Sequence, residues 1–249
     1  MIPYHPYKSG YSVLPQLKKV VDPIFNITDD QKRCLDQKKI SLTTQKCFLE
    51  HNMSDDIYES VCSFIKEKYP INIEGGFCEL AMQIQEDLAI HRLSDNDDWL
   101  AATHICFPSS WSPEEKIGKN FDEIHQPIPG MNLKNSRKII EAMVFNGPYE
   151  RFVWGLIYEN ELNYHPSLTR KPFDSNNPFF MVKVERQIMC GFPQHKTMLF
   201  VLRQYLIPED QVDKVALYEA LSGMTPEQKA YKNIPESLIE YVGRIDKSS

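Results

Sequence analysis

The chain has 249 residues, of which 42% are hydrophobic and 25% charged, and this composition excludes a disordered or collagen-like protein. The net charge of -6 disfavours a surface that binds nucleic-acid phosphates. No apolar stretch approaches the roughly 20 residues of a membrane span. The six cysteines include no C-x-x-C pair, and the first residues show no targeting signal. We therefore expect a soluble, cytoplasmic protein with reduced thiols.

The first half of the chain predicts an irregular arm followed by helices and one strand. Residues 1–50 are rich in Pro, Tyr and Lys with weak periodicity, so we interpret them as an arm packed on a single domain formed by 51–249. Apolar residues recur at helical spacing from Ser54 to Pro70 and again from Leu80 to Leu88, which predicts two amphipathic helices. The apolar run Leu100 to Phe107 precedes a proline and predicts a buried strand.

The second half predicts more helices and an antiparallel hairpin. Ser112-Pro113-Glu114-Glu115 carries the features of a helix start, and that helix should run to about His125. Further helices are expected at residues 135–145, after Pro208, at Thr225 and after Pro235, and strands at 151–158, 179–190 and 197–206. The last two strands should form a hairpin. This order favours an α+β fold over alternating βαβ units.

Two arginines in the hairpin are candidate ligand-binding residues. Period-two alternation places Arg186 in an apolar row and Glu185 on the opposite face, and Arg203 lies in a similar apolar row of the next strand. A guanidinium stays charged, so burial requires an anionic or strongly accepting partner. That partner is either a protein carboxylate, such as Glu185 or Glu150, or the carboxylate of a bound ligand. A strand-end arginine that reaches water is a third possibility.

A histidine and two tryptophans are candidates for cofactor binding. His125 ends the capped helix just before two prolines that would fix the chain direction, so it is a candidate single axial metal ligand; a helix-capping histidine is the alternative. His104, in the predicted strand, is the other candidate ligand, or else a core histidine. Trp111 and Trp154 could wall a flat cofactor pocket or simply pack in the core.

Several segments together resemble the α subunit of haem-dependent oxidative N-demethylase. The resemblance extends over roughly residues 58–242, and its segments occur in the family's order. They are Phe107-Pro108-Ser109-Ser110-Trp111, Glu115-Lys116-Ile117-Gly118-Lys119, Ile124-His125-Gln126-Pro127-Ile128-Pro129-Gly130, Val184-Glu185-Arg186-Gln187 and Phe200-Val201-Leu202-Arg203-Gln204-Tyr205.

The resemblance implies a PAS-like antiparallel sheet with flanking helices that holds haem b. It also implies a monooxygenase that uses O2 to remove a methyl group, as formaldehyde, from a small secondary amine such as dimethylamine. Electrons would come from NADPH through a separate reductase with FMN and iron–sulfur centres. His125 would be the proximal iron ligand, Arg186 and Arg203 would bind propionates or form a polar distal site, and Glu185 would receive the substrate ammonium. Because Glu185 and Arg186 point to opposite faces, only one can line the pocket, and we favour Arg186.

One strand departs from the family pattern. The family reads R-x-N-W-S where this chain has Arg151-Phe152-Val153-Trp154-Gly155, so Val153 and Gly155 replace two polar residues. Two alternatives to an oxygenase follow from this departure. One is a haem-based gas or redox sensor, and the other is a non-catalytic structural subunit that retains the fold.

Overall fold

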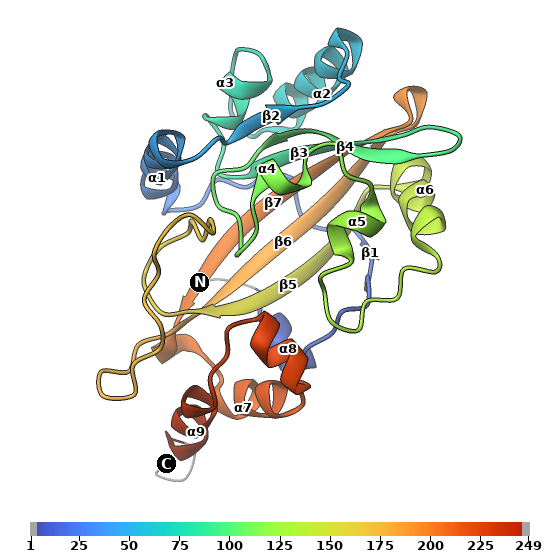
Figure 1. The fold of residues 1–249 in the computed structure, drawn as a ribbon. Coiled ribbons are helices and arrows are strands. Elements are labelled where there is room, and N and C mark those ends of the chain that lie inside the picture. The colour runs from blue at the N-terminus through green and yellow to red at the C-terminus, as the bar shows by residue number, and fades with distance from the viewer. Residues whose placement is uncertain (1–3, 246–249) are drawn as a thin grey trace.

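The computed structural model describes residues 4–245, which form a sheet flanked by helices (Figure 1). The seven-stranded sheet has the order β1-β5-β6-β7-β3-β4-β2, and every neighbouring pair is antiparallel. The strands are β1 (Lys18–Lys19), β2 (Phe48–Glu50), β3 (Asp87–Leu93), β4 (Asp98–His104), β5 (Tyr149–Ile157), β6 (Met181–Phe192) and β7 (Thr197–Pro208). The predicted α+β class is confirmed, and this sheet is compatible with a PAS-like arrangement.

Helices precede, interrupt and follow the strands. The α-helices are α1 (Gln31–Thr44), α2 (Asp55–Lys68), α3 (Phe77–Ala81), α4 (Pro113–Lys116), α5 (Phe121–His125), α6 (Ser136–Asn146), α7 (Lys214–Ser222), α8 (Pro226–Tyr231) and α9 (Glu236–Ile245). Three short 3-10 helices are η1 (Pro6–Ser9), η2 (Pro193–His195) and η3 (Glu209–Gln211). In the described part of the chain, none of the helices combines the length and apolarity that a bilayer crossing requires.

The two faces of the sheet are covered by different helices. On one face, Ile188 and Val201 pack against α2 and α3, while Val184 and Ile207 pack against α7 and α9. The opposite face is covered by the segment that contains α4, α5 and α6, which lies in front of the sheet in Figure 1. The second face carries the cavity described below.

The predicted hairpin and the helix beginning after Ser54 are confirmed as β6–β7 and α2, but two other predictions are wrong. The helix expected over Leu80 to Leu88 ends at Ala81, and Leu88 belongs to β3. Because β3 pairs with both β4 and β7, its residues are buried on both sides and lose the alternation that marks a strand. The helix expected to reach His125 breaks into α4 and α5 at Gly118, whose φ is 76°.

The first 50 residues are more regular than their composition predicted. They contain the 14-residue helix α1 and both outer strands of the sheet, β1 on β5 and β2 on β4. Between η1 and β1 the chain has no regular secondary structure, and most of residues 9–17 line one side of the cavity. These residues therefore contribute to the candidate site.

Candidate functional site

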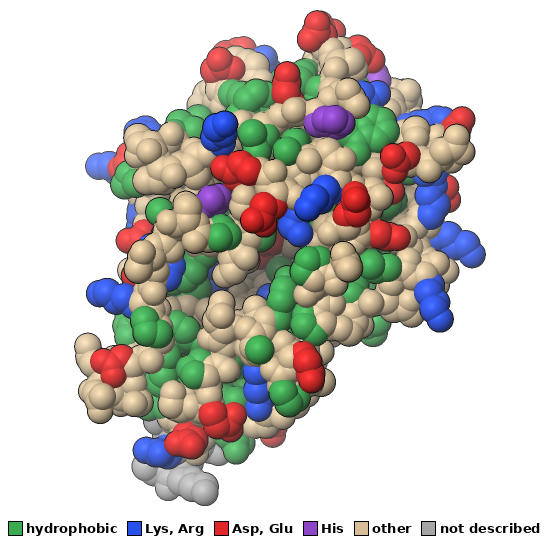
Figure 2. All heavy atoms as spheres, in the orientation of Figure 1, with side chains coloured by type: hydrophobic (Ala, Val, Ile, Leu, Met, Phe, Trp, Pro, Cys, Tyr) green, Lys and Arg blue, Asp and Glu red, His purple; other side chains and the backbone are tan. Residues whose placement is uncertain are grey.

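A cavity of about 300 Å³ lies between the sheet, residues 9–17 and the segment that contains α4, α5 and α6. Its walls are mostly apolar, with Ile124, Ile128, Met189 and Phe200 among them. The molecular surface is hollowed near the centre of the face seen in Figure 2, with acidic and basic side chains beside the hollow. An apolar cavity with a few polar groups is the usual form of a ligand site.

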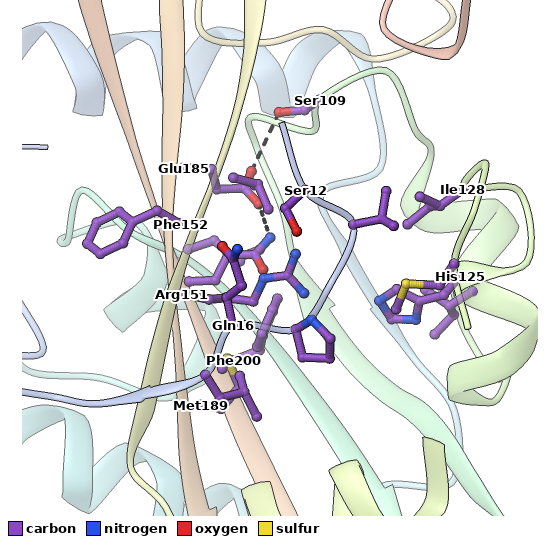
Figure 3. A pocket seen from close by; sticks show the side chains of 18 of the residues that line it. Ser12, Gln16, Ser109, His125, Ile128, Arg151, Phe152, Glu185, Met189 and Phe200 are labelled. Carbon is purple, nitrogen blue, oxygen red and sulfur yellow. Dashed lines mark hydrogen bonds between the residues drawn. The ribbon is translucent and has the colours of Figure 1, made fainter. Parts of the chain in front are cut away.

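Strand register determines which polar residues face this cavity. Arg151 on β5 lies opposite Gln187 on β6, and Val153 lies opposite Glu185, so these side chains share one face of the sheet. Arg151, Gln187 and Glu185 all line the cavity and form a polar group on its sheet wall. Figure 3 shows Arg151 and Glu185 on this wall. We call these three residues the polar wall.

Glu185 is a buried carboxylate held by neutral donors. Gln187 Nε2 donates to its Oε1 at 2.5 Å, Gln204 Nε2 donates to its Oε2, and Ser109 Oγ lies 3.5 Å from the same oxygen. Within residues 4–245 no lysine, arginine or histidine forms an ion pair with this carboxylate. Its charge acts on the pKa values of Arg151, Lys183 and Lys232, which lie near it without forming an ion pair, and a cationic ligand could pair with it directly.

Arg151 is a cation without a hydrogen-bond partner among the described residues. Its Nε is buried and unpaired, and burial lowers the pKa of the guanidinium. Leaving a buried donor unpaired costs about 1–3 kcal/mol. An accepting group on a ligand in the cavity would remove this cost.

His125 projects into the cavity from the side opposite the polar wall (Figure 3). Its Nδ1 lies 2.7 Å from the carbonyl oxygen of Phe121. A carbonyl oxygen can only accept a hydrogen bond, so Nδ1 carries the proton and donates it. The Phe121 ring also packs on the imidazole, with 4.0 Å between ring centroids. Burial lowers the pKa of His125 to about 4, so the imidazole is neutral at physiological pH. Nε2 therefore carries a free lone pair and has no hydrogen-bond partner in the described chain.

Contacts at the start of α5 position His125. Asn120 caps this five-residue helix, and Asn120 and Glu123 form a capping box. Asp98 Oδ2 accepts from the Phe121 backbone N–H at 2.7 Å and from His91 Nε2 at 2.6 Å. Asp98 therefore holds the backbone of Phe121, and the carbonyl oxygen of Phe121 in turn orients the His125 ring.

Arg186 and Arg203 do not line the cavity. They are paired across β6 and β7 on the other face of the sheet, with 1% and 3% of their surface exposed. Arg186 donates to Glu150 Oε2 from Nε at 3.0 Å and from Nη2 at 2.8 Å. Arg203 pairs with Asp30 at 3.1 Å. Protein carboxylates therefore pair with both guanidinium groups, which is the first of the three possibilities that the sequence left open.

The two tryptophans and His104 are likewise divided between the cavity and the core. Trp111 lines the cavity beside the α4 segment. Trp154 lies on β5 and packs against Tyr7 and Tyr11, although it also reaches the cavity boundary. His104 is 2% exposed in the sheet and is not among the residues that line the cavity, and burial lowers its pKa to about 4. It is a core histidine.

Two histidines line the cavity of this antiparallel α+β fold, and His91 is engaged by Asp98, so His125 is the one whose Nε2 has no partner among the described residues. The chain matches the family described as haem-dependent oxidative N-demethylase, alpha subunit-like, over residues 62–238, and it belongs to that family. The family supports a haem cofactor, and an alpha subunit implies a partner subunit. No cluster of three or more His, Cys, Asp or Glu in residues 4–245 is placed to hold a metal ion.

The residues of the cavity fit a haem. His125 offers a neutral imidazole whose second nitrogen is held by a carbonyl, the usual arrangement of a metal-binding histidine. The cavity is mostly apolar, as a porphyrin requires, and the orphaned Nε of Arg151 faces it from the polar wall. Among the residues that line the cavity, His125 is the one whose free imidazole nitrogen could hold the iron.

The sequence assigned no role to several polar residues that line the cavity, among them Arg151, Gln187 and Lys232. Alternation along β6 could have identified Gln187, because it shares the face of Glu185. Arg151 could be identified only with the register of β5 on β6. The strand that departs from the family pattern also faces the cavity, since Val153 lies directly opposite Glu185.

Proposed function

We propose that this chain is the haem b-binding oxygenase subunit of an oxidative N-demethylase that acts in the cytoplasm on a small secondary amine such as dimethylamine. The reaction consumes O2, two electrons and two protons and yields a primary amine, formaldehyde and water. The electrons come from NADPH through a separate reductase with FMN and iron–sulfur centres. The observation that carries the proposal is His125, whose Nε2 is free and faces an apolar cavity.

In this proposal, the bound haem supplies the activation of O2. His125 binds the iron, and Phe121 keeps its imidazole in the tautomer with a free Nε2. Arg151, rather than Arg186, is the cationic donor on the cavity side, because Arg186 is occupied by Glu150 on the other face. This replaces the arginine that the sequence favoured.

Glu185 binds the protonated amine. Gln187 and Gln204 hold its two oxygens, so the carboxylate is oriented before the ligand arrives. Val153, opposite Glu185, provides an apolar contact for the N-methyl groups. A carboxylate beside an apolar contact suits a small alkylammonium ion.

Formaldehyde release tests the proposal. The haem-loaded protein, given O2 and a chemical reductant, should release formaldehyde from dimethylamine. Glu185→Gln should raise KM for the amine about tenfold or more, because an ionic contact to a buried carboxylate is lost. Glu219→Gln, an exposed residue on α7, is the matched control. A haem-loaded wild type that binds O2 but releases no formaldehyde would instead support the gas sensor, and an unchanged KM would remove Glu185 from the site.

A further inference from the structure

Lys232, which directly follows α8, lies where two cavities meet. It lines the cavity that contains His125 and also a second cavity of about 720 Å³, here called the outer cavity. Tyr158, Tyr164 and Arg170 line the outer cavity, and Ser109 and Ser110 lie on its boundary with the inner one. The side chain of Lys232 therefore borders both spaces.

The side chain of Lys232 is held from several directions. Its Cδ lies 4.0 Å from the point where a Cβ would stand at Gly155, so the stem lies over β5 next to Val153. Its Nζ is 5.9 Å from the centroid of the Tyr11 ring and 5.7 Å from that of Tyr231. A cation between two aromatic rings is weakly stabilised and remains free to pair with an anion.

Lys232 differs from the other lysines near the core because its Nζ has no hydrogen-bond acceptor among the described residues. Lys38, Lys116 and Lys183 each donate to at least one backbone carbonyl. The carboxylate of Glu185 is engaged by amide donors and does not form an ion pair with Lys232. Burial lowers the pKa of Lys232, and the negative charge of the nearby Glu185 offsets this effect only in part.

We propose that Lys232 binds a carboxylate group of the ligand that occupies the cavity. Under the proposed function that carboxylate has two sources, a haem propionate or the carboxylate of an N-methylated amino acid whose ammonium group binds Glu185. The choice between these two sources rests on the proposed function, whereas the binding of a carboxylate by Lys232 does not. The cavity supplies the chemistry for both, since Lys232 and Arg151, two cations without an ion pair among the described residues, line the same space as the carboxylate of Glu185.

Ligand titrations followed by tryptophan fluorescence test this proposal, because Trp111 and Trp154 line the cavity. The probes are haem, haem dimethyl ester with both propionates esterified, N,N-dimethylglycine and dimethylamine. Lys232→Met removes the charge and keeps the stem. Lys171→Met, an exposed change on the outer cavity, is the matched control. Lys232→Arg should bind as wild type does, and thermal unfolding verifies that each variant is folded.

Loss of a charge-assisted hydrogen bond should lower affinity about tenfold. If Lys232 binds a propionate, wild type should prefer haem to haem dimethyl ester, and Lys232→Met should reduce this preference about tenfold. If a substrate carboxylate is bound, that ratio is unchanged and the affinity for N,N-dimethylglycine falls relative to dimethylamine. Should Lys232→Met not fold, Lys232→Gln replaces it.

Two results overturn the inference. One is a Lys232→Met protein whose affinities match those of wild type, and the other is a wild type that binds neither haem nor N,N-dimethylglycine. A wild type that binds N,N-dimethylglycine through Lys232 but takes up no haem would refute the proposed function and leave this inference standing.

Discussion

The buried pair Arg186–Glu150 gives a quantitative test of how the hairpin arginines are used. Arg186 is 1% exposed, donates twice to Glu150, and also donates to the carbonyl of Pro23 at 2.7 Å. Arg186→Met would leave the carboxylate of Glu150, which is 8% exposed, without its cation. Removing one partner of a buried pair costs about 3–5 kcal/mol, so the melting temperature should fall by roughly 6–20 °C in a chain of this size.

Urea and thermal denaturation of the haem-free protein, followed by circular dichroism, measure this loss. The double variant Arg186→Met with Glu150→Met should recover most of the lost stability, because an apolar pair of similar volume replaces two charges. Arg244→Met, at an exposed i,i+4 pair with Glu240, should leave stability within about 0.5 kcal/mol of wild type. A stable Arg186→Met protein that no longer takes up haem would refute this reasoning and return Arg186 to the cofactor.

Three further predictions concern α5, the core histidine and helix α6. Asp98→Ala removes two hydrogen bonds from a carboxylate and should lower the free energy of unfolding by about 2–3 kcal/mol in urea titrations; an unchanged midpoint would show that α5 does not depend on it. Burial lowers the pKa of His104 from 6.5 to about 4, so the folded state binds fewer protons than the unfolded state and loses stability as pH falls through this range. His104→Gln should reduce that slope by up to about 1.4 kcal/mol per pH unit, and parallel curves for the two proteins would contradict the assignment. A Cβ at Gly191 would stand 2.0 Å from the carbonyl oxygen of Val144 on α6. Gly191→Ala should therefore lower the free energy of unfolding by about 3 kcal/mol or more in the same urea titration. A variant as stable as wild type would show that α6 can shift freely.

Alternation along one strand predicted the arrangement of the hairpin but not which of its faces carries the cavity. The period of two correctly placed Glu185 and Arg186 on opposite faces. Selecting the cavity face required knowing that Glu150 of β5 lies beside Arg186, which depends on the register between two strands separated by a long loop. An apolar row with one arginine is equally typical of a core ion pair and of a ligand site.

Local signals also failed where tertiary packing determines the backbone. Leu80, Ile84 and Leu88 have helical spacing, yet Leu88 is buried in a strand between two neighbours. The capping signals at Ser112 correctly marked the start of α4 but could not show that Gly118 ends the helical run before α5 begins. This break sets the direction of α5 and hence of His125, so the candidate ligand was identified from the sequence but its geometry was not.

The absorption spectrum of the protein after haem addition tests the central claim most directly. Wild type should give a Soret band typical of histidine-bound haem. His125→Ala should lose or strongly shift that band and regain it when free imidazole is added, because the cavity retains its apolar walls. His51→Ala, an exposed change outside the cavity, should match wild type. A His125→Ala protein with the wild-type Soret band would contradict the assignment of His125 as the iron ligand.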